Sequence, residues 1–336
     1  MQVNAIVCKE IAEDIGSVGL QQIELPDPGP GQVRVRLKAC AVNFPDLLMI
    51  QGKYQFKPPL PFAPGGEAAG DIEACGPGVS FKEGDAVIVG MRYGGFAEAV
   101  VVDESQVKPL PQGMSYAKGA SYQTAYLTAY VALKRRGYLE QGETLLVHGA
   151  TGGVGMAAVD LGKHFGAKVI GTGGRDDKLA VVASRGADHV INYTMEDGSL
   201  GGFRDTVKAL TDGRGADVIY DPVGGDVFDE SMRCINWGGR ILSIGFTSGR
   251  WPQAPVNLIL IKQISVIGVR AGEYGRQDPV KGLENAQRLY AMAEAGEIDP
   301  YISHALPIEK AVEAMRLLEQ REVVGKAVVT MNGYQM

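Results

Sequence analysis

Cysteine, blocks of basic residues and long apolar runs are scarce in this chain of 336 residues, and each scarcity excludes a class of protein. The four cysteines are scattered and none belongs to a Cys-x-x-Cys pair, which predicts free thiols in a reducing cytoplasm rather than a disulfide framework. The 33 basic residues are outnumbered by 39 acidic ones and form no consecutive block, so nucleic acid is not an expected partner. The longest apolar stretches, such as 256–261, fall far short of the roughly 18 residues that cross a bilayer.

The amino terminus lacks a basic segment followed by an apolar core, so we expect no signal peptide, no membrane partner and a cytoplasmic location. What the chain has is typical of a soluble globular protein, with 45% hydrophobic and 21% charged residues. At about 150 residues per domain, the length predicts two domains. Glycine is abundant, with 46 residues clustered where β-branched runs end, as in the turns of an α/β enzyme.

The first third of the sequence predicts a β-rich domain. Residues 33–39 alternate apolar and polar side chains, which is the period of a half-buried strand. Further short strands are expected at 70–73, 86–89 and 98–102, separated by glycine and proline turns. Several short strands with few helices predict a mixed-β, barrel-like first domain.

From about residue 120 the pattern changes, and helices alternate with strands. We expect strands at 143–148, 168–172, 190–191, 217–220, 239–244 and 264–269, and helices at 124–134, 154–165, 177–185 and 203–210. Such alternation is typical of βαβ units and of a doubly wound parallel sheet buried on both faces, so the fold class is α/β. Helices at 280–295 and 308–318 and a strand at 327–330 form a tail that can return to the first domain.

The strongest chemical motif is the segment 148–155, His-Gly-Ala-Thr-Gly-Gly-Val-Gly, which follows an apolar strand and opens a helix. Small residues let the backbone approach a pyrophosphate, and the amino terminus of the helix supplies N–H donors and a positive dipole end. The motif has the form Ala-x-Gly-x-x-Gly rather than Gly-x-Gly-x-x-Gly. In its βαβ context it predicts dinucleotide binding.

The end of the second strand predicts NADPH rather than NADH. A site for NAD has an acid there that binds the ribose 2′-hydroxyl, whereas this chain has Gly173 and Gly174. Basic residues Arg175 and Lys178 follow, as suits a 2′-phosphate. The intervening acids, 176 and 177, can be the helix N-cap and a first-turn acid, and the alternative for Lys178 is a solvated helix residue.

Ordered motifs along nearly the whole chain resemble one family, the zinc-independent, quinone-oxidoreductase-like branch of the medium-chain dehydrogenases/reductases, which contains zeta-crystallin. The motifs are Ala-Val-Asn-Phe-Pro-Asp at 41–46, Gly-Gly-Glu-Ala-Ala-Gly at 65–70, Gly-Gly-Phe-Ala-Glu at 94–98, Thr-Ala-Tyr at 124–126, the glycine turn, Gly-Ala-Asp at 186–188, Ile-Asn-Tyr at 191–193, Asp-Pro-Val-Gly-Gly at 221–225 and Gly-Gly-Arg at 238–240.

The resemblance implies a GroES-like catalytic domain at 1–123 and 271–336, with an NADPH-binding Rossmann domain inserted at 124–270. Cofactor and substrate share the cleft between the domains in this family. The cofactor-binding residues that it implies are Asn43, Asp46, Thr128, Gly152, Gly153, Val154, Gly174, Lys178, Tyr193, Gly245, Phe246, Thr247, Val269 and Arg321. Of these, Gly174, Lys178, Tyr193 and Arg321 would surround the 2′-phosphate.

Metal is not expected at the site. Zinc enzymes of the superfamily place a cysteine and a histidine where this chain has Asn43 and Gly66, and neither residue supplies a thiolate or an imidazole. All four histidines lie outside the first 123 residues.

Without a Lewis acid, suitable acceptors are quinones and alkenes conjugated to a carbonyl, because they delocalise the incoming charge. Asn43 and Tyr54 are the catalytic candidates. The Tyr54 hydroxyl would donate to the substrate carbonyl, and the alternative is an aromatic that packs the cleft wall.

The predicted function is therefore an NADPH-dependent, metal-free reductase of quinones or α,β-unsaturated carbonyl compounds. The alternatives are an acrylate, haloacrylate or acyl-type enoyl reductase, and a noncatalytic NADPH-binding protein. The apolar strand 264–269 would end the Rossmann sheet, and an exposed edge of this kind predicts a homodimer.

Overall fold

The computed structural model describes residues 1–336, which fold as two compact units. Unit 1 comprises residues 1–123 and 293–336, and unit 2 comprises residues 124–292. The second border therefore lies at 292/293, not at the predicted 270/271. The difference arises because helix α8 (Ala271–Gln277) packs against the helical turn η3 (Val131–Arg136), and Arg135 of that turn binds helix α9 (Pro279–Glu294). The Arg135 Nε donates to Asn285 Oδ1 at 2.7 Å.

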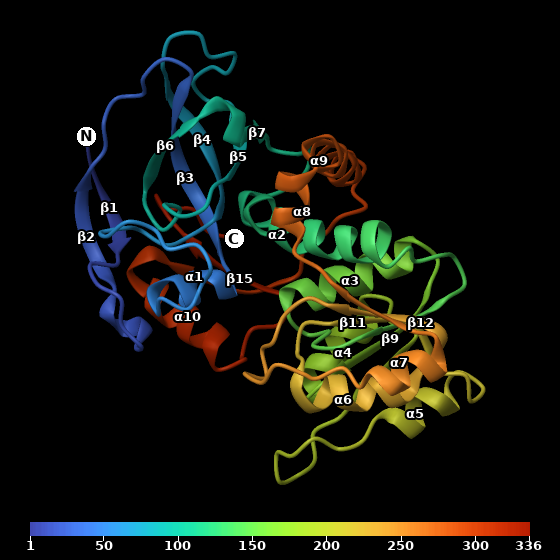
Figure 1. Cartoon of the computed structure of the whole chain (residues 1–336). Coiled ribbons are helices and arrows are strands. Elements are labelled where there is room, and N and C mark those ends of the chain that lie inside the picture. Colours follow the sequence, from blue (N-terminus) through green and yellow to red (C-terminus); the bar gives the residue numbers. More distant parts are fainter. The chain divides into compact units, whose positions relative to one another are not determined.

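Unit 1 is built on a seven-stranded sheet in which β3 (Gln32–Val42) is central. Along β3 the side chains of Val33, Val35 and Leu37 are buried, which is the alternation that the sequence predicts. The path of the sheet is β14–β15–β3–β4–β5–β7, and β6 pairs with β3 outside it. The bounds are β4 Glu67–Cys75, β5 Ala86–Gly90, β6 Ala99–Asp103, β7 Val107–Pro109, β14 Ile302–Pro307 and β15 Lys326–Thr330. Figure 1 shows β3, β4 and β5 side by side.

The carboxyl-terminal segment completes the core of unit 1. Strand β15 pairs antiparallel with β3, and α10 (Ala311–Glu319) contacts α1 (Phe44–Ile50) and β15. Apolar side chains of both segments join one buried cluster with β3. A separate two-stranded ribbon, β1 (Gln2–Val7) with β2 (Gly19–Glu24), was not predicted.

Unit 2 contains a six-stranded sheet in the order β10–β9–β8–β11–β12–β13, and every pairing in it is parallel. The strands are β8 Thr144–Val147, β9 Lys168–Gly173, β10 His189–Asn192, β11 Ala216–Asp221, β12 Ile235–Ser243 and β13 Ser265–Gly268. Numbered within the unit, this is the order 3-2-1-4-5-6 of a Rossmann fold, whose ligand crevice lies beyond the carboxyl ends of the strands where the order reverses. Here the reversal falls between β8 and β11.

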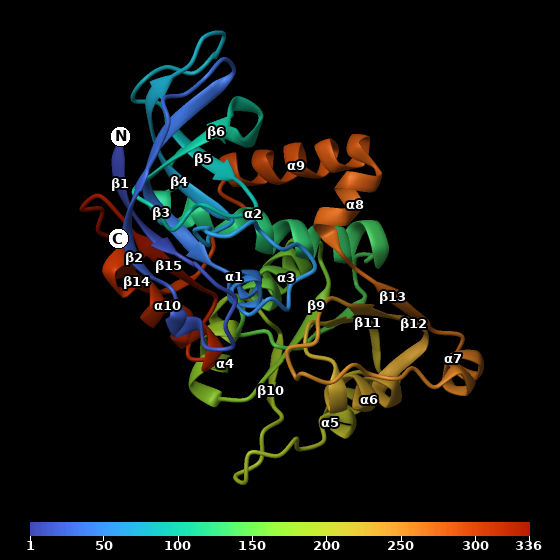
Figure 2. The same cartoon turned by 60° about the vertical axis from the view of Figure 1, so that its left-hand side comes forward.

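Helices cover both faces of this sheet (Figures 1 and 2). Helix α3 (Gly153–His164) lies on one side, while α5 (Arg204–Ala209) and α6 (Gly225–Cys234) lie on the other. Buried residues of α5 and α6, such as Val207 and Phe228, pack with sheet residues in a single core cluster. The predicted fold class, a mixed-β domain plus a doubly wound parallel sheet, is confirmed. No helix of the chain combines the length and the apolarity that a bilayer crossing requires.

Candidate functional site

The glycine turn joins β8 to α3 at the point where the sheet reverses its order. Gly149 has a φ of +55°, and Gly152 is the extended N-cap of α3. A Cβ on Gly155 would lie 2.1 Å from the carbonyl oxygen of Gly149, so only glycine lets the helix approach the turn this closely. The first N–H groups of α3 have no acceptor within the helix, and they point out of its positive end. The turn therefore fits the pyrophosphate of a dinucleotide.

The end of β9 carries two glycines, and the two acids that follow it are hydrogen-bonded to other side chains. Gly173 ends the strand and Gly174 follows. Arg175 holds Asp177 through two hydrogen bonds of 3.0 and 2.7 Å, and this contact lowers the pKa of Asp177. Asp176 Oδ1 accepts a hydrogen bond of 2.9 Å from the Asn192 side chain. Both acids are thus bound by the protein itself.

Helix α4 (Asp176–Ser184) begins differently from the prediction. Its N-cap is Arg175, so both Asp176 and Asp177 lie in the first turn, where they favour the helix dipole. Lys178 is only 6% exposed, and the alternative of a solvated helix residue is therefore wrong. Tyr193 follows β10, and its backbone N–H donates to the Gly173 carbonyl at 3.1 Å.

The remaining predicted residues of unit 2 lie near the other strand ends or on α2 (Tyr116–Tyr130). Gly245 and Phe246 follow β12, and the Thr247 hydroxyl donates to the carbonyl of residue 222 at 3.2 Å. Val269 follows β13 directly, and Thr128 on α2 donates its hydroxyl to the carbonyl of residue 124. Gly152, Gly153, Val154, Gly174, Lys178, Tyr193, Gly245, Phe246, Thr247 and Val269 therefore share the carboxyl edge of one parallel sheet.

Asp221 is a residue of this edge that sequence reasoning did not assign to the site. It ends β11, and its Oδ1 accepts hydrogen bonds from the backbone N–H groups of Val223 and Gly224 at 2.8 and 2.9 Å. Burial raises the pKa of Asp221 to about 6, although these two hydrogen bonds oppose the shift. The carboxylate shapes the loop that faces the glycine turn across the reversal of strand order.

In unit 1, Asn43 lies in a buried polar cluster with Glu67 and Lys326. The Lys326 Nζ donates to Asn43 Oδ1 at 2.6 Å and to Glu67 Oε1 at 3.2 Å. The Asn43 Nδ2 donates to the same Glu67 oxygen at 3.2 Å. The side chains of Lys326 and Glu67 are only 6% and 1% exposed.

Asp46 supports this cluster through the backbone. Its two carboxylate oxygens accept hydrogen bonds from the N–H groups of Asn43 and Gly65, at 2.8 and 3.1 Å. Burial raises the pKa of Asp46 to about 7, although the two backbone hydrogen bonds and nearby Lys326 oppose the shift. The carboxylate fixes the backbone at the start of α1.

Tyr54 and Arg321 also belong to unit 1. Tyr54 is half-buried against the unit 1 core. Arg321 follows α10 and has a φ of +61°. Cys40 is fully buried in β3, which fits a core residue rather than a nucleophile.

No group of three or more His, Cys, Asp or Glu side chains in the chain is arranged to hold a metal ion. The ammonium of Lys326 lies beside Asn43, which stands at the position of a zinc ligand in related enzymes. Glu67 and Lys326 were missed as site residues, although each begins an otherwise apolar strand segment. Because charged side chains are almost never buried without a partner, that pattern was the available signal.

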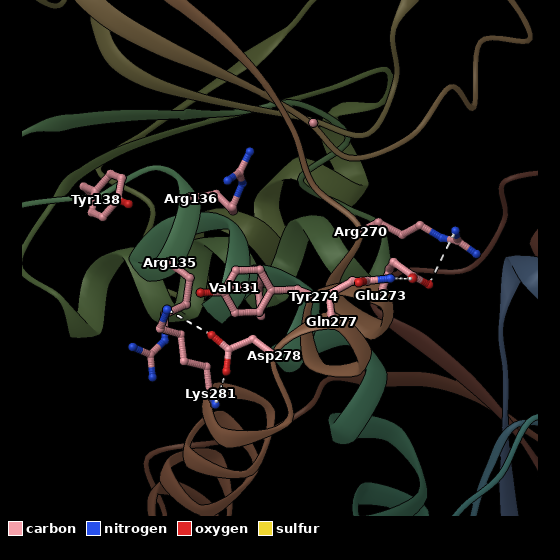
Figure 3. Close-up of a pocket in the computed structure, with 11 residues that line it drawn as sticks. Val131, Arg135, Arg136, Tyr138, Arg270, Glu273, Tyr274, Gln277, Asp278 and Lys281 are labelled. Atoms are coloured by element: carbon pink, nitrogen blue, oxygen red, sulfur yellow. Dashed lines mark hydrogen bonds and ion pairs between the residues drawn. The ribbon is translucent and has the colours of Figure 1, made fainter.

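A pocket of about 490 Å³ lies elsewhere in unit 2, between η3, the end of β13 and helices α8 and α9 (Figure 3). None of the predicted site residues lines it. Its lysine and one of its arginines are paired with its acids, Lys281 with Asp278 at 3.0 Å and Arg270 with Glu273 at 3.7 Å. The pocket is therefore lined in part by charged side chains that pair with one another.

Two family models match the chain in the order of its units. One described as "Alcohol dehydrogenase GroES-like domain" matches residues 29–112, and one described as "Zinc-binding dehydrogenase" matches residues 153–296. A protein of Nematostella vectensis named "Quinone oxidoreductase-like protein 2 homolog" is 39% identical over 97% of this chain and 88% of its own length.

Solved structures give the same result. A crystal structure of an NAD-dependent alcohol dehydrogenase aligns with a TM-score of 0.86 and 31% identity, covering 98% of this chain and 100% of that one. A mycobacterial protein in complex with NADPH aligns with a TM-score of 0.86 and 28% identity, covering 97% and 99%. The Rossmann unit and these relatives indicate a nicotinamide cofactor. The chain therefore belongs to the quinone-oxidoreductase-like branch of the medium-chain dehydrogenase/reductase superfamily of oxidoreductases, as its motifs predict.

Proposed function

We propose that this protein is an NADPH-dependent oxidoreductase that transfers a hydride to quinones or α,β-unsaturated carbonyl compounds without a metal. Unit 1 would supply the catalytic domain and unit 2 the cofactor-binding domain. The observation that carries the proposal is the buried ammonium of Lys326 beside Asn43 and Glu67. It supports a site in which a lysine ammonium, and not a metal ion, is the buried positive charge.

The preference for NADPH rests on the edge of unit 2 around the end of β9. Gly173 and Gly174 offer no carboxylate to a ribose 2′-hydroxyl, and the nearby acids 176 and 177 have protein partners. Lys178 is buried there, and a charged donor in a buried position favours a phosphate. Tyr193 and Arg321 would complete the phosphate site.

The reaction needs few groups from the protein. When bound, the reduced nicotinamide supplies the hydride. The glycine turn would anchor the pyrophosphate, while Thr128, Val269 and the segment after β12 would position the nicotinamide end. The Asn43 amide and the Tyr54 hydroxyl would donate hydrogen bonds to oxygen atoms at the reacting end. Without a Lewis acid, the acceptor itself must delocalise the negative charge, as quinones and conjugated carbonyl compounds do.

Two alternatives remain distinct by experiment. An acrylate, haloacrylate or acyl-type enoyl reductase uses the same hydride chemistry on an acid or thioester. A noncatalytic protein would bind NADPH and reduce nothing. To separate them, NADPH oxidation is measured in the presence of each member of a panel of quinones, enones, enals and acrylates. We expect turnover of quinones or enones, and tight NADPH binding with no turnover across the panel would favour the noncatalytic role.

The metal-free part of the proposal has its own test. Prolonged dialysis against EDTA should leave turnover unchanged, because the groups proposed for the reaction are an amide and a hydroxyl. Loss of turnover on dialysis, with recovery on adding zinc, would contradict the proposal.

A further inference from the structure

Three polar side chains meet at one end of the unit 1 sheet because of its register. In the antiparallel pair β15–β3, Ala327 lies opposite Val42, so Lys326 lies next to Asn43. In the pair β3–β4, Ala68 lies opposite Cys40, and Glu67 therefore reaches the same end. The cluster joins segments that are distant in the sequence but rigidly paired in the fold.

The charges of the cluster fix how the Asn43 carboxamide is turned. An ammonium can only donate hydrogen bonds and an ionised carboxylate can only accept them. The Asn43 Oδ1 therefore faces Lys326 at 2.6 Å, and its Nδ2 faces Glu67 at 3.2 Å. The reversed orientation would place the NH₂ group against the ammonium and the carbonyl oxygen against the carboxylate. The amide nitrogen carries two hydrogens, of which Glu67 accepts one.

We propose that Lys326 is a positioning residue of the reductase site, which orients Asn43 so that its amide presents an N–H donor to an acceptor oxygen of the bound ligand. This inference rests on the proposed function, in which Asn43 contacts the reacting end of the site. The proposed ligand atom is a carbonyl or hydroxyl oxygen, because such an atom accepts the Nδ2–H. If Asn43 were rotated, its carbonyl oxygen would face the ligand atom and would offer an acceptor in place of a donor. The competing explanation is that Lys326 only neutralises the buried Glu67 and stabilises the end of β15.

Two variants separate positioning from neutralisation. Lys326→Met removes the ammonium and leaves the Glu67 carboxylate buried without a counterion, so both stability and turnover should fall. The double variant Lys326→Met with Glu67→Gln removes both charges and should recover most of the thermal stability. In that variant no charge orients the amide any longer, because a glutamine can donate or accept equally well. We expect kcat to remain at least about tenfold below that of the wild type, as a lost oriented donor costs more than this in other enzymes.

The matched control is Lys38→Met. Lys38 on β3 pairs with Asp71 on β4 at 3.7 Å, and neither residue is part of the cluster. This variant should keep the kcat of the wild type. A double variant with the kcat of the wild type would overturn the proposal.

A second readout does not depend on turnover. In protein labelled with ¹⁵N-asparagine, the Asn43 side-chain signals are identified by their absence from Asn43→Ala. Both proteins should show two Nδ2 proton signals, because rotation about the amide C–N bond is slow. We expect the ¹⁵N relaxation of these signals to report a rigid carboxamide in the wild type and a mobile one in the double variant. Unchanged relaxation in the double variant would overturn the role of Lys326. If the wild type shows no turnover, the proposed function fails by itself, and the Asn43 signals still decide whether Lys326 orients the amide.

Discussion

Lys178 is the single residue on which the cofactor preference depends most. It lies in the first turn of α4 next to the glycine end of β9, and it is buried. A hydrogen bond between its ammonium and a 2′-phosphate is worth about 1.5–3 kcal/mol, or roughly 10- to 150-fold in affinity. Lys178→Ala should therefore weaken NADPH binding by about that factor and leave NADH binding almost unchanged, as measured by fluorescence titration of both nucleotides.

Lys168→Ala is the matched control for this prediction. Lys168 begins β9 at the opposite end, where its ammonium donates to the Leu210 carbonyl at 2.9 Å. Lys168→Ala should change the affinity for neither NADPH nor NADH. Equal losses of NADPH and NADH affinity in Lys178→Ala would contradict a phosphate role, as would a preference of the wild type for NADH.

We expect His148 to make the stability of the protein depend on pH. Its ring is fully buried and lies 2.8 Å from Thr172 Oγ1 and 2.7 Å from Ser231 Oγ. Burial lowers its pKa from 6.5 to about 3, so the unfolded state binds a proton at a pH where the folded state does not. Its contribution to stability is therefore present above pH 6.5 and lost as the pH falls toward 3.

At pH 4.5 this loss should amount to about 3 kcal/mol relative to pH 7.5. Denaturant unfolding of the wild type and of His148→Asn at both pH values measures it. The variant should be less stable at pH 7.5 but should lose about 3 kcal/mol less on acidification. Identical losses in the two proteins would show that His148 does not carry this dependence.

At the scale of the residue, sequence reasoning proposes side chains that are indicated by their neighbours in the chain. Lys178 follows a glycine pair at a strand end, and Asn43 stands in a recognisable motif. Glu67 and Lys326 were missed because their partners are brought together only by the pairing of β3 with β4 and β15. Asp221 was missed as a site residue because its role is to hold backbone amides.

The stability of the β8–turn–α3 element depends on Gly155, because this residue lets α3 approach the turn closely. A Cβ at Gly155 would lie 2.1 Å from the Gly149 carbonyl oxygen, so the helix or the turn must shift. Gly155→Ala should lower the free energy of unfolding by about 1–3 kcal/mol. It should also weaken the binding of both NADPH and NADH. Gly19→Ala is the control, because nothing lies within 4 Å of a Cβ there. Equal stability of the two variants would contradict a close approach of α3 to the turn.

Among the elements, alternating and continuous apolar patterns predicted β3 and the strands of the Rossmann sheet. Helix α7 (Val256–Lys262) was not predicted, because it buries no residue and its sequence is apolar almost throughout. Helix α6 begins at two glycines and carries four charged side chains in ten residues. The apolar residues that it buries were therefore not recognised as one face of a helix. Ribbon β1–β2 is stabilised by pairing between strands, which leaves only a weak signal in either strand alone.

The whole molecule presents an unpaired sheet edge beside an apolar helix. Strand β13 ends the unit 2 sheet, with Val266 36% exposed, and on α7 Val256 and Leu260 are 75% and 76% exposed. An exposed apolar edge favours pairing with a second copy of the chain. We therefore predict a homodimer with twice the 35.7 kDa mass of the chain, measured by light scattering at micromolar concentration.

The double variant Val266→Lys with Leu260→Lys should be a folded monomer that still binds NADPH, because both residues lie away from the glycine turn. A monomeric wild type would contradict the predicted dimer. A dimer that persists in the variant would place the interface elsewhere.

The central claim for the whole molecule is that it moves a hydride from NADPH to a conjugated acceptor, and isotope transfer tests this most directly. NADPH carrying deuterium at the transferred position of nicotinamide C4 is mixed with an enone that the enzyme turns over, after dialysis against EDTA. The product should contain one deuterium at the carbon β to the carbonyl, as measured by mass spectrometry and NMR. Product without deuterium, or no product unless zinc is added, would contradict the account.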